Sequence, residues 1–283
     1  MSQFDVVIAV APATEDDLTD PKPTRKKKQH AATSDAATEP RDASTAVPEP
    51  SGVGLDHCEH FPYFVSRAEA DEVYVAVVSF PWTDEGDQSA CYFGKPYFSK
   101  EKQKKNYPVH EIPSILLPFA ERIAAAAQAP VNYIQCHKLT PDQVVRPHKD
   151  PAGMIVPMLT LGQARTFRVG GTMPQGYYRM RQAQRQVSKH VPAKEILMNH
   201  GDLLIFTGGH VLHSMFPAKD DTGFNPSAYD CRYSILFRWT TDAIREHGRG
   251  KAAREAGHDQ EYKEAVENYR NGLTDFLGRK VKP

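Results

Sequence analysis

Short apolar runs separated by turn residues dominate the chain from Val131 onward. β-branched and aromatic residues gather in these runs, and Pro or Gly stands between them. Many short strands with regular turn signals predict a β-sandwich or barrel. The strands that we expect cover residues 131–136, 155–161, 166–169, 202–206, 211–215 and 233–239.

Helical spacing flanks this strand-rich region on both sides. Ser66 is followed three residues later by Glu69, the pattern of a capping box at a helix start. Apolar residues then recur with helical spacing at Ala70, Val73 and Val77. A second helix is expected over residues 115–128, ending in an alanine run. After Thr240 the chain becomes polar, and a C-terminal helix is expected from the one-face spacing of Tyr262, Ala265, Tyr269 and Leu273.

The N-terminal segment has a different composition. Residues 11 to 54 are rich in Pro, Ala, Thr, Ser and acids and nearly lack large apolar residues. Such a segment cannot bury enough surface to offset its ordering entropy, so we expect disorder. We therefore predict three parts: a disordered tail over 1–54, a mainly β (α+β) domain over 55–243 and a polar helical extension over 244–283. Within the tail, the run from Arg25 to Lys28 is either a solvated charge cluster or a nuclear-import or nucleic-acid contact.

Composition narrows the classes of protein. Of the 283 residues, 35 are Lys or Arg and 35 are Asp or Glu, so any attraction to nucleic acid or membrane must come from local patches. The four cysteines form no CxxC pair, which fits a reducing compartment and argues against a disulfide scaffold or a zinc–thiolate site. No apolar run approaches the roughly 18 residues that span a bilayer. We expect a soluble intracellular protein, nuclear or cytoplasmic, of unspecified oligomeric state.

A metal site is indicated by spaced histidines and a carboxylate. His148 and Asp150 are separated by one residue, and on a strand such residues project from the same face. Two histidines and one carboxylate leave three coordination positions open, the arrangement of non-haem Fe(II) oxygenases. The distal histidine candidates are His200, His210 and His213. His213 is favoured because it lies inside an apolar run, whereas turn residues adjoin the other two. The pair His57 and His60 is a competing site outside the strand-rich region.

Two arginines follow the expected iron ligands. Arg232 and Arg238 are six residues apart on the expected last strand. Even spacing places them on one face, with Cα atoms roughly 20 Å apart at about 3.3 Å per residue. Two long side chains that lean toward each other could bracket a small dicarboxylate beside the metal, because guanidinium is always charged and grips carboxylates bidentately. The alternative is an edge strand whose arginines face water.

Together these motifs resemble the AlkB family of Fe(II)/2-oxoglutarate dioxygenases. The resemblance extends from Phe61 to Arg238. Its motifs, in family order, are Phe-Pro-Tyr-Phe-Val-Ser (61–66), Pro81-Trp82, Tyr-Phe-Gly-Lys-Pro-Tyr-Phe-Ser (92–99), His148-x-Asp150, Leu-Thr-Leu-Gly (159–162), His200-Gly-Asp202, His213, and Asp230-Cys-Arg-Tyr233 leading to Arg238. The segment 92–99 is similar to the nucleotide-recognition lid of the family.

The resemblance implies a double-stranded β-helix (jelly roll) core that binds Fe(II), 2-oxoglutarate and O2. It implies that Arg232 binds the far carboxylate of 2-oxoglutarate and that Arg238 lies near the metal and the substrate base. Decarboxylation would give succinate, and a hydroxylated N-alkyl carbon would leave as an aldehyde. The implied partner is DNA or RNA with alkylated bases, contacted by lid residues Tyr92, Tyr97 and Phe98.

Three positions depart from the family pattern. The family usually has Asn-x-Tyr nine to eleven residues before the first iron histidine, where this chain has His137 and Leu139. The Asn that normally follows the first arginine by two residues is here Ser234. We assign His137 and Ser234 to the 2-oxoglutarate pocket. The departures keep two alternatives open: an oxygenase acting on a protein or small molecule, and a catalytically weak binding module.

A basic stretch interrupts the strand pattern between Gly171 and Glu195. It carries Arg179, Arg181, Arg185 and Lys189 with Tyr177 and Tyr178, and no acid before Glu195. Basic residues interleaved with aromatic ones suit phosphate contacts and base stacking, so we predict substrate contacts from Arg179 and Arg181. The alternative is a solvated hairpin or short helix with ordinary surface arginines.

Overall fold

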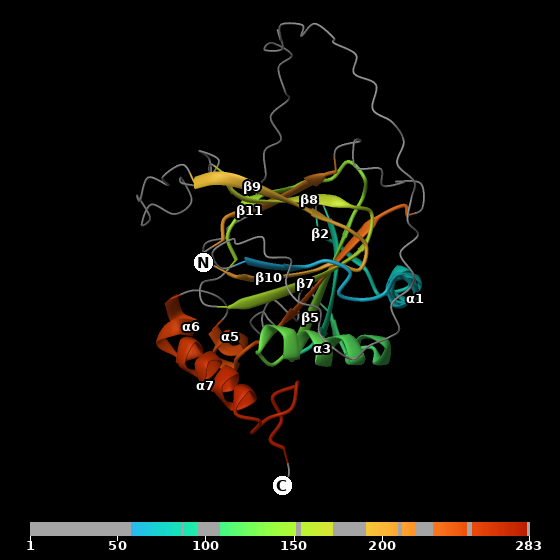
Figure 1. Cartoon of the computed structure of the whole chain (residues 1–283). Coiled ribbons are helices and arrows are strands. Elements are labelled where there is room, and N and C mark those ends of the chain that lie inside the picture. The colour runs from blue at the N-terminus through green and yellow to red at the C-terminus, as the bar shows by residue number, and fades with distance from the viewer. Residues whose placement is uncertain are drawn as a thin grey trace, which may run out of the picture. The chain divides into compact units, whose positions relative to one another are not determined.

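Two antiparallel sheets form the framework of the protein. The computed structural model describes residues 58–85, 88–95, 108–150, 154–171, 191–208, 211–218, 229–247 and 251–281. Figure 1 shows the small sheet above the large one, with most of the helices below the large sheet. Within the described part no helix is long and apolar enough to cross a membrane.

The large sheet has eight strands in the order β1-β10-β7-β12-β5-β3-β2, with β4 paired in parallel to β3. Their bounds are β1 Cys58–Phe61, β2 Thr83–Glu85, β3 Gln88–Gly94, β4 Val109–His110, β5 Tyr133–Leu139, β7 Ile155–Gly162, β10 Leu203–Thr207 and β12 Arg232–Arg238. The small sheet has the order β6-β11-β8-β9. Its strands are β6 Val145–His148, β8 Arg165–Gly171, β9 Val191–Met198 and β11 His213–Pro217. Chain segments pass repeatedly from one sheet to the other, as in a jelly roll, and this confirms the mainly β fold.

The facing sides of the two sheets enclose one apolar cluster. Successive residues of a strand point to opposite faces, so Leu236 of β12 points inward while its neighbours Ile235 and Phe237 point outward. The inner cluster unites both sheets through Val156, Met158, Phe167, Met198, Leu204, Phe206, Met215 and Leu236. Because Arg232, Ser234 and Arg238 share the parity of Leu236, they also face the interior.

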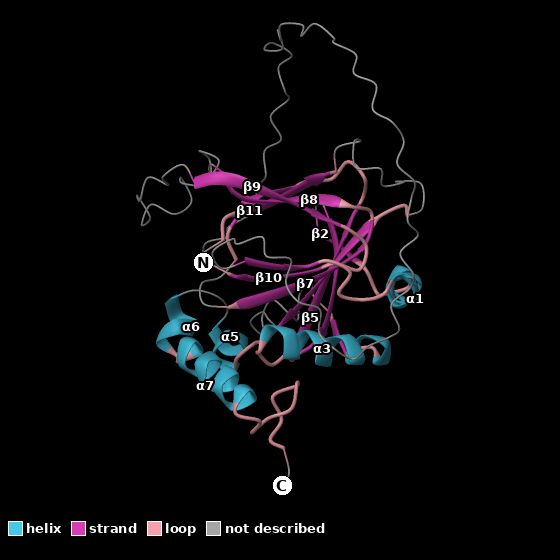
Figure 2. Cartoon of the chain, in the orientation of Figure 1, coloured by secondary structure: helices cyan, strands magenta, loops and turns pink. Residues whose placement is uncertain are grey.

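Helices cover the outer face of the large sheet (Figure 2). These are α1 Arg67–Val78, α3 Leu117–Ala127 after the 3₁₀ turn Ser114–Leu116, α5 Asp242–His247, α6 Lys251–Glu255 and α7 His258–Arg270. The expected capping box begins α1: Ser66 accepts from the Glu69 amide, and Glu69 accepts from the Ser66 amide at 2.8 Å. Glu69 also accepts from Arg122 of α3 at 2.6 Å, which ties the two helices together.

Several elements differ from the sequence prediction. His60, which we expected outside the strand-rich region, lies in β1. The strand β3 was not predicted. Where one C-terminal helix was expected, the described part of this region holds three, and the first of them starts at Asp242. Tyr262 is buried against the large sheet, where its hydroxyl accepts from the Ile155 amide at 2.9 Å. Leu273 lies past the end of α7 and is 56% exposed, so its place on the packed face was predicted wrongly.

Candidate metal centre

Three side chains from the small sheet and its connections converge at one point. His148 ends β6 and His213 begins β11, and the two residues are direct partners in the strand pairing. Asp150 lies beyond the end of β6 rather than on it, so it reaches the site from a connection and not from the strand face that we expected. One ligand atom from each of the three lies within 4.8 Å of the others. Among the described residues no other such group of His, Cys, Asp and Glu was found.

Backbone carbonyls fix the orientation of both imidazoles. Nδ1 of His148 lies 2.8 Å from the Arg146 carbonyl, and Nδ1 of His213 lies 3.1 Å from the Val211 carbonyl. A carbonyl can only accept, so each Nδ1 carries a proton, and Nε2 is the nitrogen of each ring that is left to bind a metal. Nε2 of His213 lies 3.9 Å from the carboxylate of Asp150. Imidazoles held in this tautomer by their second nitrogen are suited to metal binding.

The electrostatics favour an ionised Asp150 and a neutral His213. Burial raises the pKa of Asp150, but the charge of Arg238 and the nearby imidazoles of His213 and His148 outweigh burial and lower it overall. Burial, followed by the nearby imidazole of His148, lowers the pKa of His213 to about 4. Arg238 donates to Asp150 at 3.2 Å and is 4% exposed, so it pairs with the acid beside the metal position. At neutral pH Asp150 and His213 therefore both offer a lone pair to a metal ion.

The other arginine of the last strand has no acidic partner among the described residues. Arg232 is fully buried and donates to the hydroxyls of Thr160 at 2.8 Å and Ser234 at 3.1 Å. Its Nη1 atom has no hydrogen-bond partner in the same part of the chain. Burial, and then the charge of Arg165, lower the pKa of Arg232 to about 9. A buried guanidinium with an unused donor and two adjacent hydroxyls suits one carboxylate. The two arginines thus point to different partners, and the expected bracket, in which both lean toward each other, is not what their contacts show.

The remaining pocket residues lie on the strands beside Arg232. His137 and Leu139 of β5 pair with Ser234 and Arg232, so both departures from the family pattern face the same interior. Thr160 of β7 pairs with Ser234 from the other side and was missed by the sequence analysis. The signal was the position of Thr160 between two leucines in Leu-Thr-Leu-Gly: a polar side chain on the inward face of a buried strand needs a hydrogen-bond partner there.

Two rival histidines have other structural roles. His60 lies with Nε2 3.1 Å from the buried carboxylate of Asp202. His200 accepts from the Gly162 amide at 2.8 Å, and its Nε2 lies 3.2 Å from Asp71. Neither belongs to the convergent cluster. His57 and His210 lie outside the described residues.

The expected substrate residues are only partly described. Tyr92, assigned to the lid, lies in β3, is 2% exposed and stacks on Tyr133 with ring centres 6.3 Å apart. It faces the interior beside Tyr133, the pairing partner of Arg238. The other residues assigned to substrate lie outside the described residues: Tyr97, Phe98, Arg179 and Arg181.

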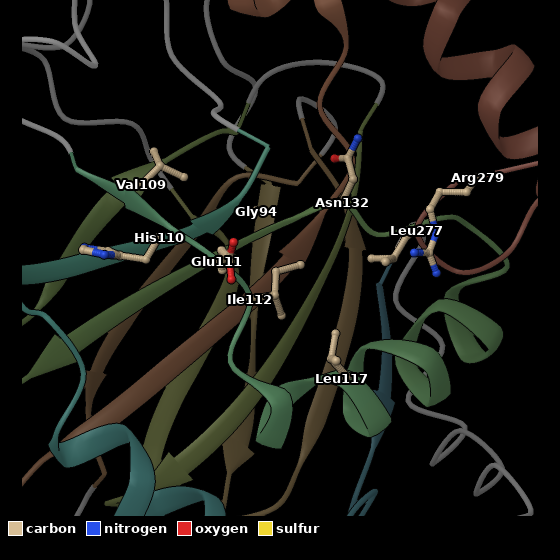
Figure 3. A pocket seen from close by; sticks show the side chains of 9 residues that line it. All are labelled: Gly94, Val109, His110, Glu111, Ile112, Leu117, Asn132, Leu277 and Arg279. Atoms are coloured by element: carbon tan, nitrogen blue, oxygen red, sulfur yellow. The ribbon is translucent and has the colours of Figure 1, made fainter.

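A surface cleft of about 750 Å³ lies between β4, the start of α3 and the C-terminal segment (Figure 3). It includes none of the cluster residues or pocket arginines. Two of its polar side chains already have partners: the amide of Asn132 donates to and accepts from the backbone of Thr240, and Arg279 pairs with Asp275. The interior cluster is therefore the better candidate for chemistry.

Comparison with known proteins gives one curated relative. It is the alpha-ketoglutarate-dependent dioxygenase AlkB of Escherichia coli (strain K12), 26% identical over 150 residues. The match covers 50% of this chain and 62% of that protein, less than two thirds of its length. No family model matches the chain.

The solved structures that match the chain include one described as the structure of OsALKBH1, with a TM-score of 0.42 and 16% identity over 65% of this chain and 98% of that one. Another is HygX from Streptomyces hygroscopicus with nickel and 2-oxoglutarate bound, with a TM-score of 0.42 and 11% identity over 64% and 82%. Over the matched half of its length the chain is thus similar to AlkB.

Proposed function

We propose that this chain is an Fe(II)- and 2-oxoglutarate-dependent dioxygenase that oxidatively dealkylates N-alkylated bases in DNA or RNA. The observation that supports it best is the convergence of His148, Asp150 and His213 in the same interior as Arg232, a buried arginine with an unused donor. Iron would be held by the two Nε2 atoms and the Asp150 carboxylate, a donor set typical of Fe(II) oxygenases. The bound metal would supply the activation of O2, with 2-oxoglutarate as the electron donor.

The residues of the chain would orient the reactants. Arg232, with the hydroxyls of Thr160 and Ser234, would hold the far carboxylate of 2-oxoglutarate. Arg238 would hold Asp150 in its ionised form by donating to one of its two oxygens. The surrounding apolar cluster, with Phe167 stacked on His213 at 5.2 Å, would keep water from the reacting atoms.

The substrate proposal is supported by the AlkB relative and the lid-like sequence. The test is to incubate the protein with Fe(II), 2-oxoglutarate, O2 and a panel of N-methylated DNA and RNA oligonucleotides. We expect succinate, an aldehyde and loss of the methyl mass from one oligonucleotide, with Asp150→Ala as the inactive control. Metal-dependent succinate without mass loss from any oligonucleotide would reject nucleic-acid dealkylation and keep the oxygenase.

One observation favours a second substrate class. Tyr92, the first residue of the lid-like segment, is buried in β3 instead of lying at the surface. An oxygenase acting on a protein or small molecule would have no need of an exposed base-stacking residue there. Succinate formation stimulated by peptides or metabolites, and not by oligonucleotides, is the result that this class predicts.

A further inference from the structure

A second buried arginine lies beside Arg232. Arg165, at the start of β8, is 1% exposed and shares its parity along the strand with Phe167 of the inner cluster, so it also faces the interior. Its guanidinium donates to the carbonyl of Thr140 and, at 2.8 Å, to that of Gln143. The sequence analysis did not single this residue out.

The backbone places the two arginines next to each other. Thr140, which accepts from Arg165, directly follows Leu139, the pairing partner of Arg232. A second link joins the segments that precede the two arginines. The amide of Gln163, two residues before Arg165, donates at 3.1 Å to the carbonyl of Cys231, the residue before Arg232. Two guanidiniums from opposite sheets therefore share one end of the interior.

Neither guanidinium has an acid in contact within the described part of the chain. Two acids act on the guanidiniums through their charge alone. Asp202 favours the ionised form of Arg232, but its oxygens are occupied by His60 and by the amides of Tyr63 and Asn199. Asp142 favours the ionised form of Arg165 from the surface, where it accepts from the Thr140 hydroxyl. The Nε atom of Arg165 and the Nη1 atom of Arg232 are buried without hydrogen-bond partners in that part.

A clamp on two carbonyls does not need a charge. Buried charges are normally paired, because desolvating an ion without a partner is strongly unfavourable. Placing a second cation beside Arg232 adds repulsion, and a neutral donor could hold the carbonyls of Thr140 and Gln143 equally well. The arrangement makes physical sense if an anion enters between the two guanidiniums.

We propose that Arg165 determines the co-substrate specificity of the pocket: its buried charge acts with that of Arg232 on the distal carboxylate of 2-oxoglutarate and selects 2-oxo diacids over 2-oxo monoacids. This rests on the proposed function and deepens it. Arg232 contacts the carboxylate, whereas Arg165 strengthens the positive potential around it and donates through Nε.

The test is binding of two matched acids by the full chain loaded with Mn(II) without O2. 2-Oxoglutarate and 2-oxopentanoate have the same length, but the second has a methyl group in place of the distal carboxylate. Arg165→Met should weaken 2-oxoglutarate binding by on the order of tenfold, as removal of one nearby charge at an effective dielectric of about 20 requires. Its effect on 2-oxopentanoate should stay within about twofold, because that acid lacks the charge. The control is Arg168→Met on the same strand, where a half-exposed arginine pairs with Glu195.

If Arg165→Met weakened the binding of both acids equally, the proposal would be overturned, because equal losses are expected when the segment from Thr140 to Gln143 merely loses its structure. An unchanged affinity for 2-oxoglutarate would overturn the proposal as well. Arg165→Gln keeps donors for the carbonyls without the charge and should reproduce the selective loss. If neither variant folds, the same comparison is made with Arg232→Met. The charge of Arg165, which this variant keeps, should leave it a measurable preference for 2-oxoglutarate over 2-oxopentanoate. The absence of any preference would refute the role of Arg165. A wild-type protein that binds neither acid with Mn(II) would reject the proposed function itself.

Discussion

Replacing Arg232 by Met should remove a charge that destabilises the ligand-free protein. The pKa of Arg232 falls to about 9 through burial and the charge of Arg165. Against an ordinary value of about 12.5, with about 1.4 kcal/mol for each tenfold change in proton affinity, the ionised form is disfavoured by on the order of 5 kcal/mol. The variant also loses two hydrogen bonds, to Thr160 and Ser234, together about 3–6 kcal/mol for a charged donor. The free energy of unfolding of the variant should therefore lie between about 1 kcal/mol below and about 2 kcal/mol above that of the wild type.

Binding of the co-substrate should make the wild-type protein more stable to unfolding than Arg232→Met. Wild-type protein with Mn(II) and 2-oxoglutarate at 100 times its dissociation constant gains about 2.7 kcal/mol, and Arg232→Met should gain almost nothing. Urea unfolding of both proteins, with and without ligand, measures all four values, and Arg168→Met controls for the loss of an arginine. A ligand-free variant destabilised by more than about 3 kcal/mol, as expected for breaking a satisfied buried ion pair, would refute the description of Arg232 as an unpaired charge.

Three further predictions concern other parts of the chain. His213→Gln should abolish Mn(II) binding measured by electron paramagnetic resonance while leaving circular dichroism unchanged, whereas His200→Gln should still bind; loss of binding only in His210→Gln would reassign the distal ligand. Burial lowers the pKa of His258, so its folded pKa lies below the unfolded value of about 6.5 and stability should be lost as pH falls below that value; an equally steep acid loss in His258→Gln would contradict this. A variant of the basic stretch with Arg179, Arg181 and Arg185 changed to Ala should bind oligonucleotides more weakly. Its slope of log K against log salt should be lower by roughly 0.7–0.9 for each phosphate that it no longer binds. An identical slope would leave these residues as ordinary surface arginines.

The sequence predicted the convergent cluster because few residue types serve a metal. His148 and Asp150 are close in sequence, and His213 lies in an apolar run that had to become a strand. The pairing of His213 with His148 explains why both imidazoles reach one point. Strands with strong apolar content, such as β7 and β12, were located to within two residues for the same reason: burial on both faces leaves little freedom in the pattern.

The misses have physical reasons too. The strand β3 contains Gln, Ser, Ala and Gly and lacks both alternation and a long apolar run, so its pairing with β5 supplies the structure that its sequence does not indicate. Arg165 was passed over because arginine at the start of a strand is usually exposed. Its burial depends on the opposite sheet, which no local pattern encodes.

The charges of the interior connect the metal position with the co-substrate pocket. Among the described residues, the buried arginines Arg165, Arg232 and Arg238 face it, and Asp150 is the acid that pairs with one of them. A divalent cation on His148, Asp150 and His213 would add positive charge beside Arg238, and a dianion that reaches Arg232 would offset it. Each of the two ligands therefore makes the other easier to bind, because each lowers the unbalanced charge that the other meets in a medium that screens poorly. In this proposal the alternation of polar side chains along β12 has a single purpose, since Arg238 would serve the metal end and Arg232 the carboxylate end of the same bound molecule.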